Sequence, residues 1–123
     1  MRPSLFLAGD DLFLLSRLTA ALDPAAFTAY LLADGRAVRH LLHDEMPASE
    51  LALFVLDGSE NVTEVRSLMA AHRSTRFLFL APDYPPTAAL ARVVAAHGGA
   101  VLPKSEAPVV VAATLVAMLK ASP

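Results

Sequence analysis

Four charged residues have the types and the placement for joint chemistry, namely Asp10, Asp11, Asp57 and Lys104. Each of them follows a short apolar run within three positions. Clustered carboxylates repel one another, and Mg²⁺ relieves that repulsion well because it takes hard oxygen ligands and keeps several waters. A carboxylate beside Mg²⁺ and a lysine can accept a phosphoryl group, because both cations neutralise charge on the transferring oxygens. The residue types therefore indicate a phosphoryl-accepting magnesium site, provided that the fold brings them together.

The strongest of these apolar runs ends at Asp57. Six apolar residues stand in a row at positions 51–56 without alternation, which favours a strand buried on both faces in the middle of a parallel sheet. In open parallel sheets, ligands and chemistry gather at the carboxyl ends of the strands. Taken alone, Asp57 is equally well explained as a cap of the following helix. The ends of the other strands therefore decide its role.

Short apolar runs and segments of helical period alternate five times along the chain. The predicted strands end near Ala8, Ala33, Asp57, Ala81 and Leu102, and the last helix is predicted over residues 108–120. This alternation predicts a doubly wound α/β fold with a five-stranded parallel sheet and right-handed crossovers. Because parallel strands share one carboxyl edge, the four charged residues should meet there.

The composition describes one compact domain, which we expect to cover residues 1–123. Of the 123 residues, 55% are hydrophobic and 18% are charged, and the formal net charge is −2. A basic excess is absent, so nucleic acid is not expected as a direct partner. We find no Ser-His-Asp order, no G-x-S-x-G and no P-loop, and we therefore do not expect an enzyme.

Cysteine is absent, which excludes disulfides and cysteine-ligated metals and fits a reducing cytoplasm. The apolar core of the first ten residues is too short for a signal peptide. No apolar run approaches the ~20 residues of a membrane span. We therefore expect a cytoplasmic protein without a membrane partner.

In order and spacing, the residues at the strand ends resemble the receiver domain of two-component response regulators. That family has an acidic pair after the first strand, a phospho-accepting Asp after the third, a Ser or Thr after the fourth and a Lys-Pro after the fifth. Asp10, Asp57 and Lys104 fit three of these places, and Ala33-Asp34-Gly35 is similar to the start of the family's second helix. The resemblance covers nearly the whole chain.

The resemblance implies a flavodoxin-like, CheY-like fold with strand order 2-1-3-4-5 and a place in a phosphorelay. In a working receiver of this kind, Asp57 would be the phosphoacceptor and Lys104 would contact the phosphate. Asp10, Asp57 and Asp11 would form the candidate Mg²⁺ site. The implied partner is another signalling protein, either a histidine kinase or an output partner.

The chain departs from the family pattern at several of these places. Gly9 stands at the first acidic position in one alignment, with Asp10 as the second acid and Asp11 as an extra; a slide by one residue makes the pair Asp10 and Asp11. Ala81 replaces the hydroxyl residue, and Val101 replaces the aromatic residue of the switch. Ser105 also replaces the proline that follows the lysine.

These departures predict an atypical receiver, a protein-interaction module in which phosphorylation of Asp57 is weak or absent. The first alternative is a functional Mg²⁺-dependent phospho-receiver. The second is a small flavodoxin-like ligand-binding domain unrelated to signalling.

A histidine cluster and the apolar last helix lead to two further predictions. His40, His43, Asp44 and Glu45 form a small cluster that could bind a metal, but histidines near a helix C-terminus are better explained by the helix dipole. The last predicted helix is apolar on every side. We expect its inner stripe and its outward face to contain the following residues: Val109, Ala112, Ala113 and Val116 inside, and Val110, Val111, Leu115 and Met118 outside.

The surplus of apolar residues on the last helix predicts a contact surface. We expect a homodimer or a partner contact through the fourth helix, the fifth strand and the fifth helix.

Overall fold

A parallel sheet forms the centre of the molecule. The computed structural model describes residues 3–33, 49–58 and 60–120. Its strands are β1 Ser4–Gly9, β2 Thr28–Ala33, β3 Leu51–Val55, β4 Arg76–Ala81 and β5 Ala100–Pro103. They pair in the order β2-β1-β3-β4-β5, and every neighbouring pair is parallel. The predicted doubly wound fold and its strand order are therefore confirmed.

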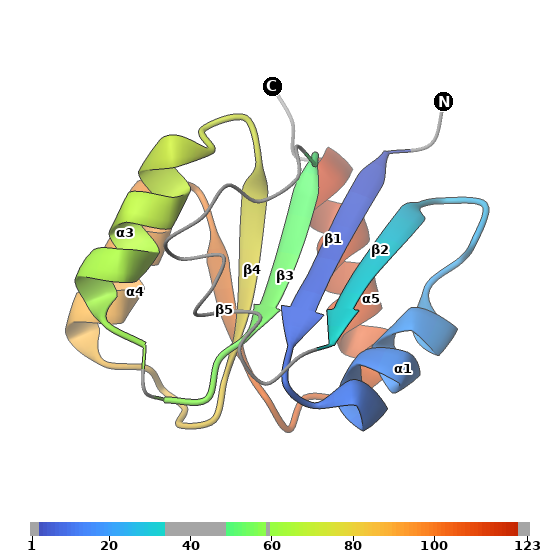
Figure 1. Ribbon diagram of the computed structural model, residues 1–123, viewed down its shortest axis with the longest axis horizontal. Helices are drawn as coiled ribbons and strands as arrows, with labels where there is room; N and C mark the ends of the chain where they lie inside the picture. The colour runs from blue at the N-terminus through green and yellow to red at the C-terminus, as the bar shows by residue number, and fades with distance from the viewer. Residues whose placement is uncertain (1–2, 34–48, 59, 121–123) are drawn as a thin grey trace.

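The helices cover both faces of this sheet. They are α1 Leu12–Ala21, α3 Val62–Ala71, α4 Ala88–Ala96 and α5 Pro108–Lys120. Helices α1 and α5 lie on one face, and α3 and α4 lie on the other (Figure 1). The predicted second helix and the cluster from His40 to Glu45 lie outside the described residues. Within the described part of the chain, no helix is long and apolar enough to cross a membrane.

The face covered by α3 and α4 is built around phenylalanine rings. The ring of Phe54 in β3 meets those of Phe77 and Phe79 in β4 edge-on, with 5.9 Å between the centroids in each case. Phe6 in β1 packs against the same ring at 6.2 Å. Edge-to-face pairs of this kind stabilise a core beyond the area that they bury. We call these four residues the phenylalanine layer.

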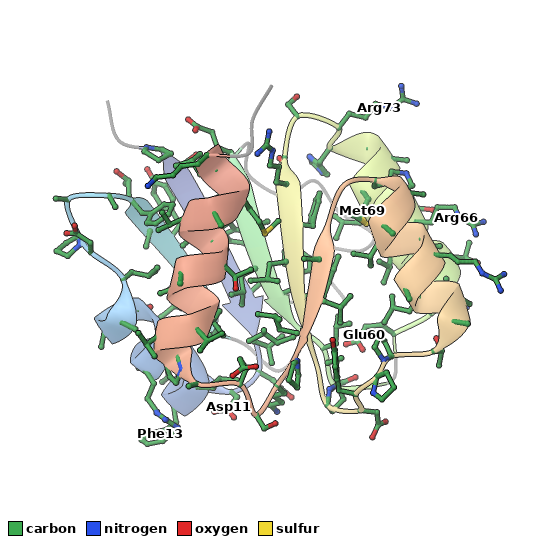
Figure 2. All side chains as sticks on the ribbon, turned by 180° about the vertical axis from the view of Figure 1, so that it is seen from behind. Asp11, Phe13, Glu60, Arg66, Met69 and Arg73 are labelled. Carbon is green, nitrogen blue, oxygen red and sulfur yellow. The ribbon has the colours of Figure 1, made fainter. Side chains whose placement is uncertain are left out.

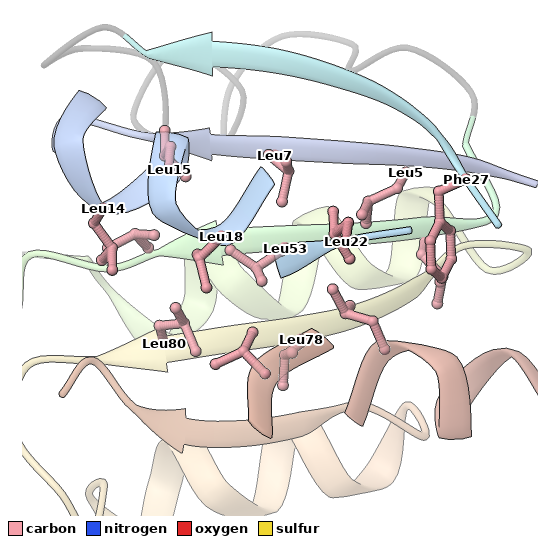
Figure 3. Close-up of a cluster of buried hydrophobic side chains, with 14 residues drawn as sticks. Leu5, Leu7, Leu14, Leu15, Leu18, Leu22, Phe27, Leu53, Leu78 and Leu80 are labelled. Carbon is pink, nitrogen blue, oxygen red and sulfur yellow. The ribbon is translucent and has the colours of Figure 1, made fainter. Parts of the chain in front are cut away.

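The other face is filled mainly by leucines. Alternate residues of the central strands, such as Leu7, Leu53 and Leu78, belong to one buried cluster on this face, and Leu15 and Leu18 of α1 belong to the same cluster (Figure 3). Residues Leu51 to Leu56 are all buried, with at most 4% of any of them exposed. Strand β3 is thus buried on both faces, as its unbroken apolar run predicts.

Helices α3 and α4 begin at side chains that cap them. The Asn61 side chain accepts a hydrogen bond from the backbone N–H of Thr63, and the Thr87 hydroxyl accepts one from Leu90. Gly98, at φ +72, follows the end of α4. The starts of α3 and α4 are therefore fixed by side chains as well as by the backbone.

Strand β3 ends two residues earlier than predicted. Regular pairing stops at Val55, although the Leu56 N–H still donates to the Leu80 carbonyl at 2.9 Å. Asp57 lies beyond this last bond, in the loop toward α3. The apolar run is longer than the strand because Leu56 remains buried after the pairing has ended.

The orientation predicted for α5 is wrong at four of its positions, although Ala112 and Val116 do pack on the sheet side as predicted. Val111 and Leu115, which were expected to face outward, are each 1% exposed and pack into the leucine face. Val109 was expected to face inward but is 70% exposed, and Ala113 is exposed as well. A helix that is apolar on every side carries no polar stripe, so its sequence does not indicate its rotation.

We predict that Val111→Glu and Val109→Glu have very different effects on stability. A glutamate at position 111 would bury an unpaired charge and should lower the free energy of unfolding by at least about 3 kcal/mol. At the exposed position 109 the same change should alter it by less than about 0.5 kcal/mol. Urea unfolding followed by circular dichroism measures both values. Equal losses in the two variants would contradict the orientation of α5.

Candidate functional site

The carboxyl ends of the strands form one edge of the sheet, which we call the carboxyl edge. Asp10 follows β1, Asp57 follows β3 and Lys104 follows β5, so the parallel fold places them at this edge, as predicted. Asp10 and Asp57 are exposed, whereas Asp11 and Lys104 are half-buried. Figure 2 shows Asp11 near the start of α5, and Glu60 on the side of α3 and α4.

Asp11 has a structural role at the carboxyl edge. Its Oδ1 atom accepts the backbone N–H of Leu14 at 3.0 Å and so caps α1. Its Oδ2 atom lies 3.9 Å from Nζ of Lys104. The two side chains are 39% and 34% exposed, so this ion pair contributes only up to about 1 kcal/mol. The structure thus brings together two of the four predicted site residues, Asp11 and Lys104.

Gly9 stands where the backbone of β1 comes closest to a side chain of β3. A Cβ atom added to Gly9 would lie 2.9 Å from Cβ of Val55 and 3.3 Å from its Cγ2. Both atoms belong to the short, branched side chain of Val55, which cannot move aside as the end of a long side chain could. A side chain at position 9 would therefore force β1 and β3 apart. The first acid of the family pattern therefore does not fit at this position, and the available acids are Asp10 and Asp11.

A carboxylate that the sequence did not predict lies beside Asp57. Glu60 accepts the backbone N–H of Asp57 at 3.0 Å on Oε2 and at 3.2 Å on Oε1. Its Oε1 also accepts the N–H of Gly58 at 3.0 Å. Gly58 adopts φ +94, a conformation that suits glycine. The sequence signal was an acid three positions after Asp57 with a glycine between them, which lets the side chain reach back to the strand end.

The half-buried position of Glu60 changes its acidity. Burial raises the pKa of the Glu60 carboxyl above its usual range, and the negative charge of Asp57 raises it further. The backbone hydrogen bonds to the carboxylate oppose this shift only in part. The surroundings of Asp57 are therefore already unfavourable to added negative charge.

The ends of β4 and β5 offer little to an anion. The side chain of Ala81 is 4% exposed and has no donor. The backbone carbonyl of Ala81 accepts the N–H of Lys104 at 2.8 Å, which fixes the start of the loop after β5. Val101 is half-buried and packs against the buried cluster that contains the phenylalanine layer. Lys104 is thus the one charged donor among the predicted site residues.

A magnesium ion does not fit the described arrangement well. Among residues 3–33, 49–58 and 60–120, no three His, Asp or Glu side chains lie close enough together to hold a metal ion. One of the predicted ligands, Asp11, caps a helix and faces Lys104. The Mg²⁺ site of Asp10, Asp11 and Asp57 therefore stays a prediction from the sequence.

We predict that the neighbouring acids Asp10 and Asp11 differ in their contribution to stability. Asp11→Ala removes the cap of α1 and should lower the free energy of unfolding by about 0.5–2 kcal/mol. Asp10→Ala is the matched control and should change it by less than about 0.5 kcal/mol, because Asp10 is exposed. Both values follow from urea titration. A larger loss for Asp10→Ala would show that the two roles had been exchanged.

Comparison with known proteins relates this arrangement to one fold. No protein-family model and no curated protein matches the sequence. Among solved structures, a response regulator from Thermotoga maritima is similar, with a TM-score of 0.73 and 12% identity over 98% of this chain and 100% of the other. A CheY-like receiver domain protein from Methanospirillum hungatei JF-1 gives a TM-score of 0.74 and 13% identity, over 98% and 95% of the two chains.

The BeF3-activated receiver domain of DrrB gives a TM-score of 0.70 and 15% identity, over 98% of this chain and 99% of the other. Similarity over nearly the whole of each chain at such low identity shows a common fold with divergent side chains. The chain therefore has the fold of the response-regulator receiver domains, as the resemblance in its sequence predicts.

Proposed function

We propose that this chain is an atypical receiver domain that works by contacting another signalling protein, with phosphorylation of Asp57 weak or absent. The partner is a histidine kinase or an output protein of a two-component system in the cytoplasm, and the chain is not an enzyme. The observation that carries the proposal is the Glu60 carboxylate, which is hydrogen-bonded to the backbone N–H groups of Asp57 and Gly58.

Glu60 opposes an added phosphoryl group in two ways. A phosphoryl group carries about −1.5 to −2 charges at pH 7, and Glu60 would bring further negative charge close to it. Successive backbone N–H groups at a turn are natural donors to an anion. Here the N–H groups of Asp57 and Gly58 already donate to Glu60, so an anion would have to displace that carboxylate.

Few other donors could compensate. Ala81 has no hydroxyl, and losing a hydrogen bond to a charged group costs about 1.5–3 kcal/mol, or roughly a ten- to hundredfold change in an equilibrium. Nζ of Lys104 already lies 3.9 Å from Asp11, so a phosphate would compete with that carboxylate for the lysine. Both effects lower the stability of a phosphorylated form.

A phosphate at Asp57 would also have little means of changing the rest of the molecule. The resemblance assigns that task to a hydroxyl after β4 and an aromatic ring in β5, and this chain has Ala81 and Val101 there. A ligand shifts a conformational equilibrium only through contacts that differ between the two states. We therefore expect the surface of α4 and α5 to be nearly the same with and without phosphate.

A titration with beryllofluoride and Mg²⁺ tests this proposal. We expect small NMR shifts confined to the carboxyl edge, because the donors are few and Glu60 repels the anion. Asp57→Asn is the control that removes the acceptor. Strong shifts that depend on Asp57 and extend to α4 and α5 would instead support a functional Mg²⁺-dependent receiver, with Asp10 as a ligand and Lys104 as the phosphate contact.

We further propose that the partner contact uses the face formed by α4, β5 and α5, and that a second copy of the chain can bind there. The support is the apolar exposure on α5, where Val109 is 70% and Val110 is 42% exposed. Exposed apolar side chains that lie together often mark a protein interface.

Self-association should therefore depend on Val109. Val109→Glu places a charge in the proposed interface and should weaken dimerisation at least about tenfold, since an unpaired charge in an interface is strongly disfavoured. Sedimentation equilibrium measures the dissociation constant. Phe13→Glu is the matched control, because Phe13 is 74% exposed but belongs to α1. A wild-type protein that remains monomeric, or equal weakening by both variants, would contradict this face.

A further inference from the structure

A pocket of about 220 Å³ opens at the carboxyl edge between the loop after β3 and the loop after β4. Its walls come from the end of β3, the first turn of α3, the end of β4 and the start of α4, and they contain these residues: Leu56, Gly58, Glu60, Val62, Val65, Ala81, Pro82, Asp83, Pro85, Pro86, Thr87 and Leu90. Neither Asp57 nor Lys104 is among them. The pocket is therefore adjacent to the predicted phosphoryl site but separate from it.

Most of the pocket wall is apolar and stiff. Leu56, Val65 and Ala81 are buried side chains of the core, and at most 4% of any of them is exposed. Three prolines of the loop after β4 form the opposite wall, and the proline ring fixes φ. A cavity with such walls is largely formed before a ligand arrives, which lowers the entropic cost of binding.

The charged side chains of the described wall are both acidic, Glu60 and Asp83. The Glu60 carboxylate is held in place by the N–H groups of Asp57 and Gly58. Oε1 accepts a hydrogen bond from each of the two N–H groups, and Oε2 accepts one from Asp57 alone. A carboxylate can accept about four hydrogen bonds in all. Oε2 therefore keeps the capacity to accept a further hydrogen bond from a ligand.

We propose that this pocket binds a small apolar molecule that carries one protonated amine. The apolar body would lie against the prolines and the core residues, and the ammonium group would donate to Glu60, with Asp83 adding negative charge at the rim. A charge-assisted hydrogen bond of this kind is roughly twice as strong as a neutral one. Anions of the same shape would be repelled by both carboxylates.

The size of the pocket favours a small molecule over a side chain of a partner protein. At about 220 Å³ the pocket lies below the range of about 300–1,000 Å³ that is typical of ligand sites, so it has room only for a small compound. A lysine side chain from another protein would satisfy Glu60 but would leave much of the apolar wall uncovered. The proposal does not depend on phosphorylation of Asp57.

Binding can be tested by NMR titration of the whole chain with 2-phenylethylammonium chloride, without Mg²⁺ or beryllofluoride. We expect saturable shifts confined to the pocket residues, with a dissociation constant of about 0.1–10 mM, as such a small ligand allows. Under the same conditions 3-phenylpropionate, which has a similar size and the opposite charge, should give no saturable shifts. Equal responses to the two compounds would overturn the proposal.

Variants of the acids identify the group that binds the amine. Glu60→Gln should weaken binding of 2-phenylethylammonium about ten- to hundredfold, because it removes a charge-assisted hydrogen bond. Glu50→Gln is the matched control, since Glu50 precedes β3 at the opposite edge of the sheet and should leave binding unchanged. Asp83→Asn alters an exposed loop residue and should weaken binding a few-fold even if Glu60→Gln does not fold.

A comparison with n-butylammonium separates a small molecule from a lysine side chain of a partner. We expect the phenyl compound to bind at least about tenfold more tightly, because it covers more of the apolar wall. Equal affinity for the two amines would show that the apolar wall contributes nothing, and it would overturn the proposal in favour of a lysine from another protein.

Discussion

Burial of β3 on both faces is the constraint on which the rest of the structure depends. Its side chains alternate between the phenylalanine layer and the leucine face, so helices must cover both sides of the sheet. Parallel neighbours on each side of β3 then bring the ends of β1, β3 and β4 to one edge. The candidate site residues Asp10, Asp11, Asp57, Glu60 and Lys104 lie at or near this edge because of that arrangement.

The sequence predicts the sheet well because unbroken apolar runs report burial directly. The run at 51–56 identifies the central strand, and the runs that end near Ala8 and at Ala81 identify its neighbours. The rotation of α5 was not predictable in the same way. Val109 and Val111 have the same side chain, and only packing against the leucine face distinguishes the buried residue from the exposed one.

The candidate site was predictable in position but not in its contacts. Parallel topology places Asp10, Asp57 and Lys104 at the carboxyl edge, and the structure has them there. The interaction of Lys104 with Asp11 depends on side-chain geometry across two loops, which no spacing rule supplies. Glu60 was missed for a related reason, because its role arises from the turn at Gly58 and from the N–H groups of Asp57 and Gly58, which lie beyond the end of β3 and donate to its carboxylate.

Gly9 shows how packing can limit chemistry. Val55 fills the space that a side chain at position 9 would need. The first acid of the receiver pattern is therefore excluded by steric overlap with Val55 and not by electrostatic repulsion. Replacing Gly9 with an acid would therefore separate β1 from β3 before it could add a ligand. Restoring a receiver-like acidic pair in this chain would require changes at both positions together.

Glu60 connects the two proposals made for this molecule. Its carboxylate lies against the backbone of Asp57 and also lines the neighbouring pocket. A cation bound in the pocket would offset the charge of Glu60, and the electrostatic cost of an anion at Asp57 would then fall. By thermodynamic linkage, an anion at Asp57 would strengthen binding of the cation by the same factor. The carboxylate that we propose to disfavour phosphorylation of Asp57 in the free chain would thus make Asp57 sensitive to a ligand in the pocket.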